Sequence, residues 1–230
     1  MIVREEEDGY ILIRQHDHGR VSGDFADHWK DLPDASTRIG IRYHDVGWEE
    51  LDKQIRWNPM TGKPYTFENY PMEQKLDAYT SGINRVERMD AFSACLCSMH
   101  FVSFFSNPVE SVAIQFVERE KERQQRLVHK MKRLERDRLA PCLRMLKLCD
   151  DLSLFLCLNP PGKNEHPWYR KGFWFGDQHL CPIWESPNVL RIVPSLFATS
   201  FEVVIPYQMI RFSGERQKEG VYRIQVIGGE

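Results

Sequence analysis

The segment from residue 91 to residue 105 is apolar on nearly every side of a helix, and it constrains the fold more than any other part of the sequence. Such a helix has to be enclosed by other elements, so we expect it at the centre of a helical body. Asp90 is a suitable N-cap for this helix, and Pro108 would end it. Periodicity and cap signals predict further helices over residues 17–29, 34–45, 71–88, 109–138 and 139–158.

Segments with a β pattern stand at both ends of the chain. Residues 10–14 are rich in β-branched and aromatic side chains, and alternation recurs over residues 189–193, 201–212 and 221–227. Residues 159–188, with five prolines, are expected to be irregular. We therefore predict a mainly α fold: a helical bundle with a small antiparallel β layer from the C-terminal segment, which the N-terminal strand can join. The predicted division is a helical domain over residues 1–158 and a β-rich segment over residues 159–230, packed on the same domain.

The charge balance and the cysteines limit the classes of function. The 31 basic and 33 acidic residues give a net charge of -2, so a large basic surface and a nucleic-acid partner are not expected. Residues 118–138 carry a local excess of basic side chains, which we interpret as a solvated helix. No run of about 18 apolar residues and no signal-peptide pattern occurs, which predicts a cytoplasmic protein without a membrane partner. The six cysteines form no Cys-x-x-Cys pair and are predicted to be free thiols in a reducing compartment.

Histidine and aspartate side chains stand at apolar places in four predicted helices. His18 shares a helix face with valine, phenylalanine and tryptophan, and His100 lies in the most apolar helix. His44 and Asp45 are adjacent at a helix end. Asp150 lies on a stripe that is otherwise leucine and cysteine. A buried carboxylate is costly unless it is paired or bound to a metal, so these side chains are predicted to meet.

The chemistry of this set favours a metal. Imidazole nitrogen and carboxylate oxygen suit a divalent transition ion such as Mn, Fe, Co, Ni or Zn, as one ion or two. Asp151, next to Asp150, falls on a polar face and is interpreted as a solvated or salt-bridged group. For each residue alone, a core histidine bonded to a backbone carbonyl or an aspartate that caps a helix is the simpler alternative.

The order of these residues resembles the HD-domain superfamily of metal-dependent phosphohydrolases, which are helical proteins named for an adjacent His-Asp pair. The match looks closer still to an uncharacterised, mainly bacterial branch known only as a domain of unknown function. The stretches that carry this resemblance are Gln15-x-x-His18, His44-Asp45-x-Gly47-Trp48, Thr61-Gly62-Lys63-Pro64, Ser98-x-His100-Phe101 and Asp150-x-Leu152-Ser153-Leu154.

The resemblance implies a ligand set. His18, His44, Asp45 and Asp150 would bind the metal, and His100 would be an extra ligand or would face the substrate. Asp45 and His100 would be the catalytic residues. Members with a full two-metal site usually carry two histidines between the His-Asp pair and the final Asp, and only His100 is well placed here. A mononuclear site is therefore expected, with a second ion held by Asp45 and His100 as the alternative.

The expected reaction is hydrolysis of a small phosphorylated metabolite or nucleotide by metal-activated water. Positive groups would bind the phosphate, and an aromatic ring would stack on a flat group; the candidates are Arg42, Lys53, Arg56 and Lys63, with Trp48 and Tyr65. Alternatively, the two rings seal the hydrophobic core. A di-iron oxygenase on the same fold and a non-catalytic metal- or ligand-binding protein are the alternative functions. Association into a homo-oligomer is left open. Glycine-rich phosphate loops and serine-hydrolase elbows are absent from the sequence.

Overall fold

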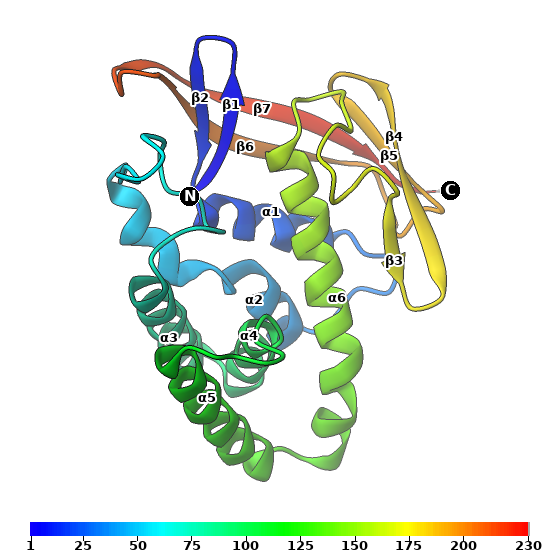
Figure 1. Cartoon of the computed structure of the whole chain (residues 1–230). Helices are drawn as coiled ribbons and strands as arrows, with labels where there is room; N and C mark the ends of the chain where they lie inside the picture. Colours follow the sequence, from blue (N-terminus) through cyan, green and yellow to red (C-terminus); the bar gives the residue numbers. More distant parts are fainter. Residues whose placement is uncertain (230) are drawn as a thin grey trace.

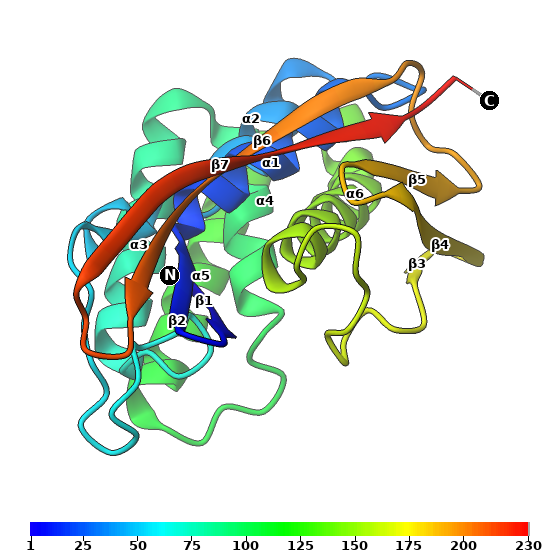
Figure 2. The ribbon, with the colours of Figure 1, turned by 90° about the horizontal axis from the view of Figure 1, so that it is seen from above.

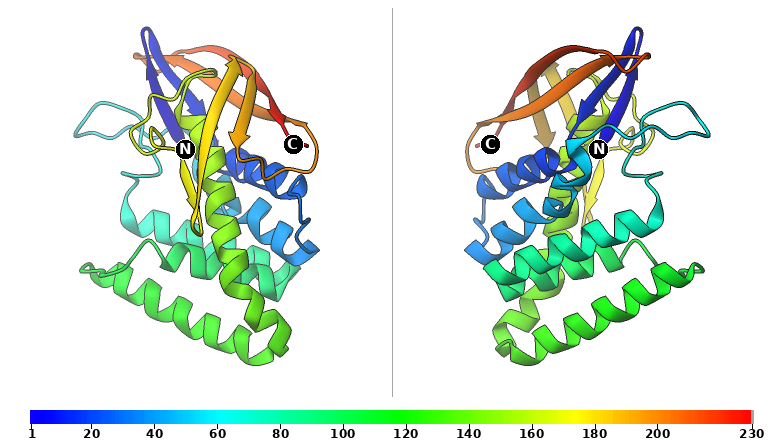
Figure 3. Two further views of the ribbon diagram at one scale, coloured as in Figure 1. Left: turned by 90° about the vertical axis from the view of Figure 1, so that its right-hand side faces the viewer. Right: turned by 90° about the vertical axis from the view of Figure 1, so that its left-hand side faces the viewer.

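The computed structural model describes residues 1–229 and consists of a helical layer covered on one side by a curved β-sheet (Figures 1 and 3). The helices are α1 (Gln15–Asp27), α2 (Ala35–Tyr43), α3 (Met72–Met89), α4 (Ala91–Val102), α5 (Ser111–Lys130) and α6 (Arg133–Leu158), with 3-10 turns η1 (Val46–Glu49) and η2 (Leu51–Lys53). The strands are β1 (Ile2–Glu6), β2 (Gly9–Ile13), β3 (Phe173–Phe175), β4 (Gln178–Ser186), β5 (Val189–Val193), β6 (Phe201–Arg211) and β7 (Arg216–Ile227).

The strands form one seven-stranded sheet in the order β1-β2-β6-β7-β5-β4-β3. All neighbours are antiparallel except β5 and β7, which are parallel. The two ends of the chain share this sheet, because β2 pairs with β6. Figure 2 shows β6 and β7 running as long curved strands across α1, which they cover.

The prediction of a mainly α fold with a small antiparallel β layer is wrong, because this mixed sheet spans the molecule. Strand β1 carries Arg4, Glu5 and Glu6, and this charged sequence shows no strand pattern. It becomes a strand through its backbone pairing with β2. Strand β7 begins at Arg216, in an exposed polar stretch that is extended through backbone pairing with β6 rather than through burial. Such pairing joins residues that are far apart in the sequence, so alternation within one segment does not reveal it.

The helical layer follows the sequence pattern more closely. Helix α4 is buried along most of its length, and the Asp90 side chain caps it by accepting a hydrogen bond from the Ser93 amide at 2.7 Å. The predicted boundary between residues 138 and 139 is displaced, because α5 ends at Lys130 and α6 begins at Arg133. No glycine or proline marks this break, and Pro141 lies inside α6. Within residues 1–229, no helix combines the length and the apolar character needed to cross a membrane.

Candidate metal centre

Four helices deliver five histidine and aspartate side chains to one point in the helical layer. Helix α1 carries His18, the end of α2 carries His44 and Asp45, α4 carries His100 in its last turn, and α6 carries Asp150. All five side chains are buried or nearly so. The structure therefore brings together every residue that the sequence proposed as a metal ligand.

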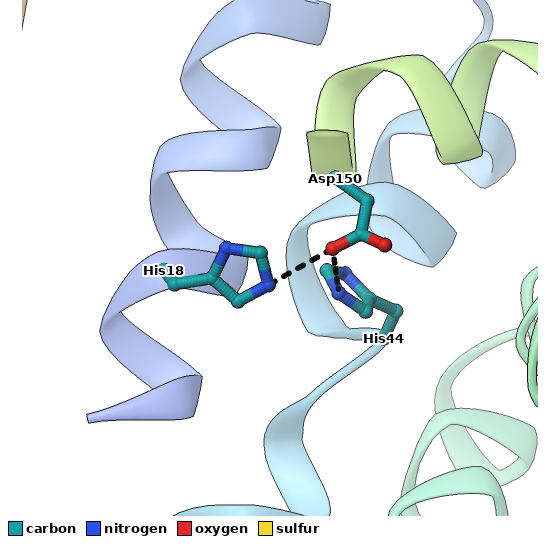
Figure 4. A group of neighbouring side chains, drawn as sticks. All are labelled: His18, His44 and Asp150. Carbon is teal, nitrogen blue, oxygen red and sulfur yellow. Dashed lines mark ion pairs between the residues drawn. The ribbon is translucent and has the colours of Figure 1, made fainter. Parts of the chain in front are cut away.

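The histidine nitrogens and carboxylate oxygens of this cluster lie close together (Figure 4). Asp150 Oδ1 lies 3.0 Å from His18 Nε2 and 3.4 Å from His44 Nε2. Asp45 Oδ2 lies 3.5 Å and 3.6 Å from the same two nitrogens. His100 Nε2 is 3.5 Å from Asp150 Oδ2. One ligand atom from each of His18, His44 and Asp150 lies within 4.8 Å of the other two.

These separations match those between donors around one metal ion. With metal–ligand distances near 2.1 Å, neighbouring donors are about 3.0 Å apart in an octahedron and about 3.4 Å apart in a tetrahedron. The Nε2 atoms of His18 and His44 are buried and make no hydrogen bond of normal geometry in the protein. Both lie within ion-pair distance of Asp150 Oδ1, but buried nitrogens without a well-formed hydrogen bond are rare, and a bound ion would satisfy both.

The other ring nitrogens hold the two imidazoles in position. His44 Nδ1 lies 2.8 Å from the Ile41 carbonyl oxygen, and His18 Nδ1 contacts Ser153 Oγ. In the tautomer that leaves Nε2 free, both Nδ1–H groups donate to these oxygens. Metal-bound histidines usually donate their second N–H to a carbonyl, carboxylate or other oxygen in this way.

In this cluster, burial and the neighbouring charges shift the pKa values of the side chains in opposite directions. Burial acts to lower the pKa of His44, but the carboxylates of Asp45 and Asp150 outweigh it and raise this pKa to about 9. Burial also acts to lower the pKa of His18, and the same carboxylates raise it. The pKa of Asp150 lies well below its ordinary value, because the imidazoles outweigh its burial. Without a metal the cluster would hold protons on these histidines, and a divalent ion would displace them.

His100 differs from the other two histidines. Burial lowers its pKa to about 4, and its Nδ1 atom is buried without a hydrogen-bond partner. Its ring packs against the ring of His44 at 5.3 Å and against that of Phe104 at 4.7 Å. His100 therefore borders the His18–His44–Asp150 group through Asp150 and offers a neutral imidazole to it.

Two glycines allow the surrounding backbones to approach closely. A Cβ atom on Gly19 would lie 3.3 Å from the Arg42 carbonyl oxygen and 3.7 Å from the His44 ring, so α1 packs tightly on the end of α2. A Cβ atom on Gly47 would lie 1.9 Å from the Ala78 carbonyl oxygen. Only glycine therefore fits where η1, directly after His44 and Asp45, packs on α3.

The proposed substrate-binding residues do not join the cluster. Arg42 forms ion pairs with Asp24 at 2.8 Å and Asp27 at 2.7 Å, and so links α2 to α1. Trp48 is 1% exposed and packs edge-on against Tyr70, in the position of a core residue.

The loop residues have partners of their own. Lys63 is exposed and pairs with Glu5 of β1. Tyr65 is half-buried against the Tyr70 ring, Lys53 pairs with Glu50, and the Arg56 guanidinium lies over the Tyr70 ring. None of these contacts joins the loop residues to the cluster, so their binding of a substrate stays a prediction.

The sequence reasoning gave no role to two residues that hold the cluster. Gln15 Nε2 donates to Asp45 Oδ2 at 3.0 Å, and Ser153 contacts the ring of His18. Each stands three residues from a proposed ligand on the same helix, Gln15 before His18 and Ser153 after Asp150, which places it on the same helix face. A polar residue at this spacing on an apolar face is the signal that could have identified them.

Comparison with known proteins places the chain in a family. Residues 1–211 match the family described as "Protein of unknown function (DUF3891)", and the chain belongs to it. The comparisons with curated proteins and with solved structures each give no match.

The assignment to the HD-domain superfamily is wrong, because the matching family is a different one and nothing in the comparisons is an HD domain. The motif that carried the resemblance is short. A His-Asp pair with a histidine before it and an aspartate after it requires only that a few helices meet, and here the helices lie under a seven-stranded sheet. Residue order alone therefore does not identify the superfamily.

Proposed function

We propose that this member of the DUF3891 family binds one divalent transition-metal ion in its helical layer and hydrolyses a small phosphorylated metabolite or nucleotide. His18, His44 and Asp150 would hold the ion. Asp45 would complete the set, and His100 would lie at its edge. Mixed imidazole and carboxylate ligands suit Mn, Fe, Co, Ni or Zn.

The observation that carries this proposal is the pair of buried imidazole nitrogens without a hydrogen bond. The Nε2 atoms of His18 and His44 converge on one oxygen of Asp150, while their Nδ1 atoms are held from behind. A cluster maintained for stability alone would use these nitrogens in well-formed hydrogen bonds, because a buried polar group without a hydrogen bond costs about 1–3 kcal/mol.

The remaining residues position this set. Gln15 fixes one oxygen of Asp45, and the second nitrogen of each metal-facing histidine is anchored to Ile41 or Ser153. A bound ion would supply a water of lowered pKa and would polarise a phosphoryl oxygen. Asp150 is 13% exposed, whereas the other four side chains are 5% exposed or less, so the cluster is accessible from one side. This accessible side favours a catalytic site over a closed structural one.

Hydrolysis of p-nitrophenyl phosphate and of nucleotides by protein loaded with each candidate ion tests the proposal. We expect activity that requires the ion and that is lost in Asp150→Asn. Asp151→Asn is the matched control, because Asp151 is exposed on the next position of α6 and contacts Tyr169. Bound metal without turnover of any phosphate ester would favour the non-catalytic metal-binding alternative and would contradict the hydrolase.

A further inference from the structure

A cysteine and a histidine meet on the solvent-facing side of the sheet, outside the metal centre. Strands β3 and β4 form a hairpin at one edge of the sheet, and β4 carries His179 and Cys181 (Figure 1). Two residues apart on a strand, these side chains point to the same face. Both are exposed, whereas Leu180 between them is fully buried. Cys181 Sγ lies 3.6 Å from His179 Nδ1, so the thiol and the imidazole are in contact.

The second nitrogen of His179 orients the ring toward the thiol. Nε2 lies 2.5 Å from the carbonyl oxygen of Lys171, which can only accept a hydrogen bond, so Nε2 carries the proton in the neutral imidazole. Nδ1 then offers a lone pair, and the Cys181 thiol donates to it. A nucleophile beside a base that a third group holds in place is the arrangement that nucleophilic cysteines use.

The backbone of Gly172 makes this orientation possible. Its φ angle is +76°, and a Cβ atom at this position would lie 2.2 Å from the Leu180 carbonyl oxygen and 3.2 Å from His179 Nε2. Only glycine therefore allows the segment that carries the Lys171 carbonyl to approach the histidine ring.

A cavity of about 520 Å³ lies beside this pair and has a positive lining. Cys181 and His179 line it together with Arg170 and Lys171, and no aspartate or glutamate stands among its described lining residues. The Glu165 carbonyl oxygen holds Arg170 by accepting a hydrogen bond from its Nε at 2.9 Å. Reactive cysteines typically lie in such electropositive, partly exposed surroundings, and a hollow lined by charges of one sign attracts ligands of the opposite sign.

An exposed aromatic ring completes the cavity. Trp174 of β3 is paired with His179 of β4, and the centres of the two rings are 4.9 Å apart. The Trp174 side chain lines the cavity and is 67% exposed. It therefore offers a flat apolar surface next to the thiol for the body of a ligand.

We propose that Cys181 and His179 form a thiol–disulfide exchange site for small disulfides that carry carboxylate groups. Arg170 and Lys171 bind the carboxylates. His179 Nδ1 takes the thiol proton while Cys181 Sγ attacks one sulfur of the bound disulfide.

The exchange needs no further reactant. The S–S bond of the small disulfide breaks as a new S–S bond to Cys181 forms, and the proton held by His179 passes to the departing sulfur or to water. Cys181 is oxidised, and the departing half of the disulfide is reduced to a thiol. Transient disulfides of this kind are the ones that occur in reducing compartments.

The test is the reaction of native protein with dithiobis(nitrobenzoate), an aromatic disulfide with two carboxylates whose released thiolate is coloured. Stopped-flow absorbance should show a fast phase of one thiol per chain, and mass spectrometry should place the mixed disulfide on Cys181. The phase should be lost in Cys181→Ser. It should be unchanged in Cys142→Ser, the matched control, because Cys142 is half-buried on α6 and contacts Thr37 instead of a histidine.

The role of the imidazole is tested with a second pair of variants. His179→Gln should slow the fast phase about tenfold or more, since it removes the proton acceptor. His129→Gln removes an exposed imidazole from α5 and should react as wild type does. The replaced side chains are exposed, so the variants should fold, and circular dichroism establishes this.

The charge of the substrate is tested by comparing two disulfides. Arg170→Gln and Lys171→Gln should each slow the reaction with dithiobis(nitrobenzoate) about threefold and leave the reaction with uncharged dithiodipyridine unchanged. Lys130→Gln, which removes an exposed charge from the end of α5, should leave both reactions unchanged.

The two parts of the proposal fail separately. If Cys181 shows no fast phase, or if His179→Gln reacts as fast as wild type, the exchange site is overturned. If the Arg170 and Lys171 variants react with the anionic disulfide at the wild-type rate, the assignment of carboxylate-bearing disulfides is overturned. Neither result depends on whether the His18–His44–Asp150 cluster binds a metal.

Discussion

Replacing Ser153 with alanine removes one hydroxyl group and should weaken metal binding without removing any ligand. Ser153 is fully buried, and its Oγ atom contacts His18 Nδ1. The same oxygen lies 3.1 Å from the His18 carbonyl oxygen and 3.0 Å from Ser22 Oγ. In the variant, the ring of His18 would carry a buried N–H without an acceptor and would be free to turn.

The expected magnitude follows from this single lost contact. Loss of a hydrogen bond to a metal-binding histidine lowers metal affinity by about 10–100-fold, which is about 1.4–2.7 kcal/mol. The unpaired N–H should also destabilise the metal-free protein by about 1–3 kcal/mol. Competition with a chromophoric chelator measures the affinity, and urea unfolding of the metal-free protein measures the stability.

Ser22→Ala is the matched control. Ser22 is fully buried and lies next to Ser153, and its hydroxyl donates to the His18 carbonyl oxygen at 3.2 Å, but it does not touch the imidazole. Its metal affinity should stay within about threefold of wild type, since ligand orientation is the quantity that matters. Equal metal affinities for wild type and Ser153→Ala would refute the argument that Ser153 orients His18.

Two further predictions concern the scaffold. Gly47→Ala should destabilise the protein by about 3 kcal/mol or more, because the new Cβ would lie 1.9 Å from the backbone oxygen of Ala78, which no rotamer change relieves; a denaturation midpoint equal to that of wild type would contradict this packing. In native protein, a thiol reagent should label exposed Cys181 first and half-buried Cys142 next. The other four cysteines are buried, and burial also raises the pKa of their thiols; they are Cys95, Cys97, Cys149 and Cys157. Labelling of these four should require denaturant. Fast reaction of any of them in native protein would contradict the described core.

The cluster could be predicted from the sequence because each of its residues stands out within its own helical segment. A histidine or aspartate on an otherwise apolar helix face has to be compensated inside the protein, and this rule selected Asp150 over Asp151. The structure brings Asp150 to His18, His44, Asp45 and His100, and Asp151 is exposed. Whether the cluster binds a metal stays a prediction.

The sheet and the substrate residues could not be found in the same way. The charged strand β1 becomes a strand through β2, and the polar end of β7 through β6. Arg42 and Lys63 looked available in the sequence, but their carboxylate partners come from other elements. Each of these facts depends on contacts between distant segments, which single-segment patterns do not contain.

The most direct test of the account is the metal content of the protein, purified without chelator and measured by elemental analysis for wild type and Asp150→Ala. We predict about one divalent transition-metal ion per chain in wild type and loss of that ion in the variant. Circular dichroism would establish that both proteins are folded. Folded wild-type protein that holds no ion, even after incubation with Mn, Fe, Co, Ni and Zn, would contradict the account, and His18, His44 and Asp150 would then be a buried, proton-bridged core network.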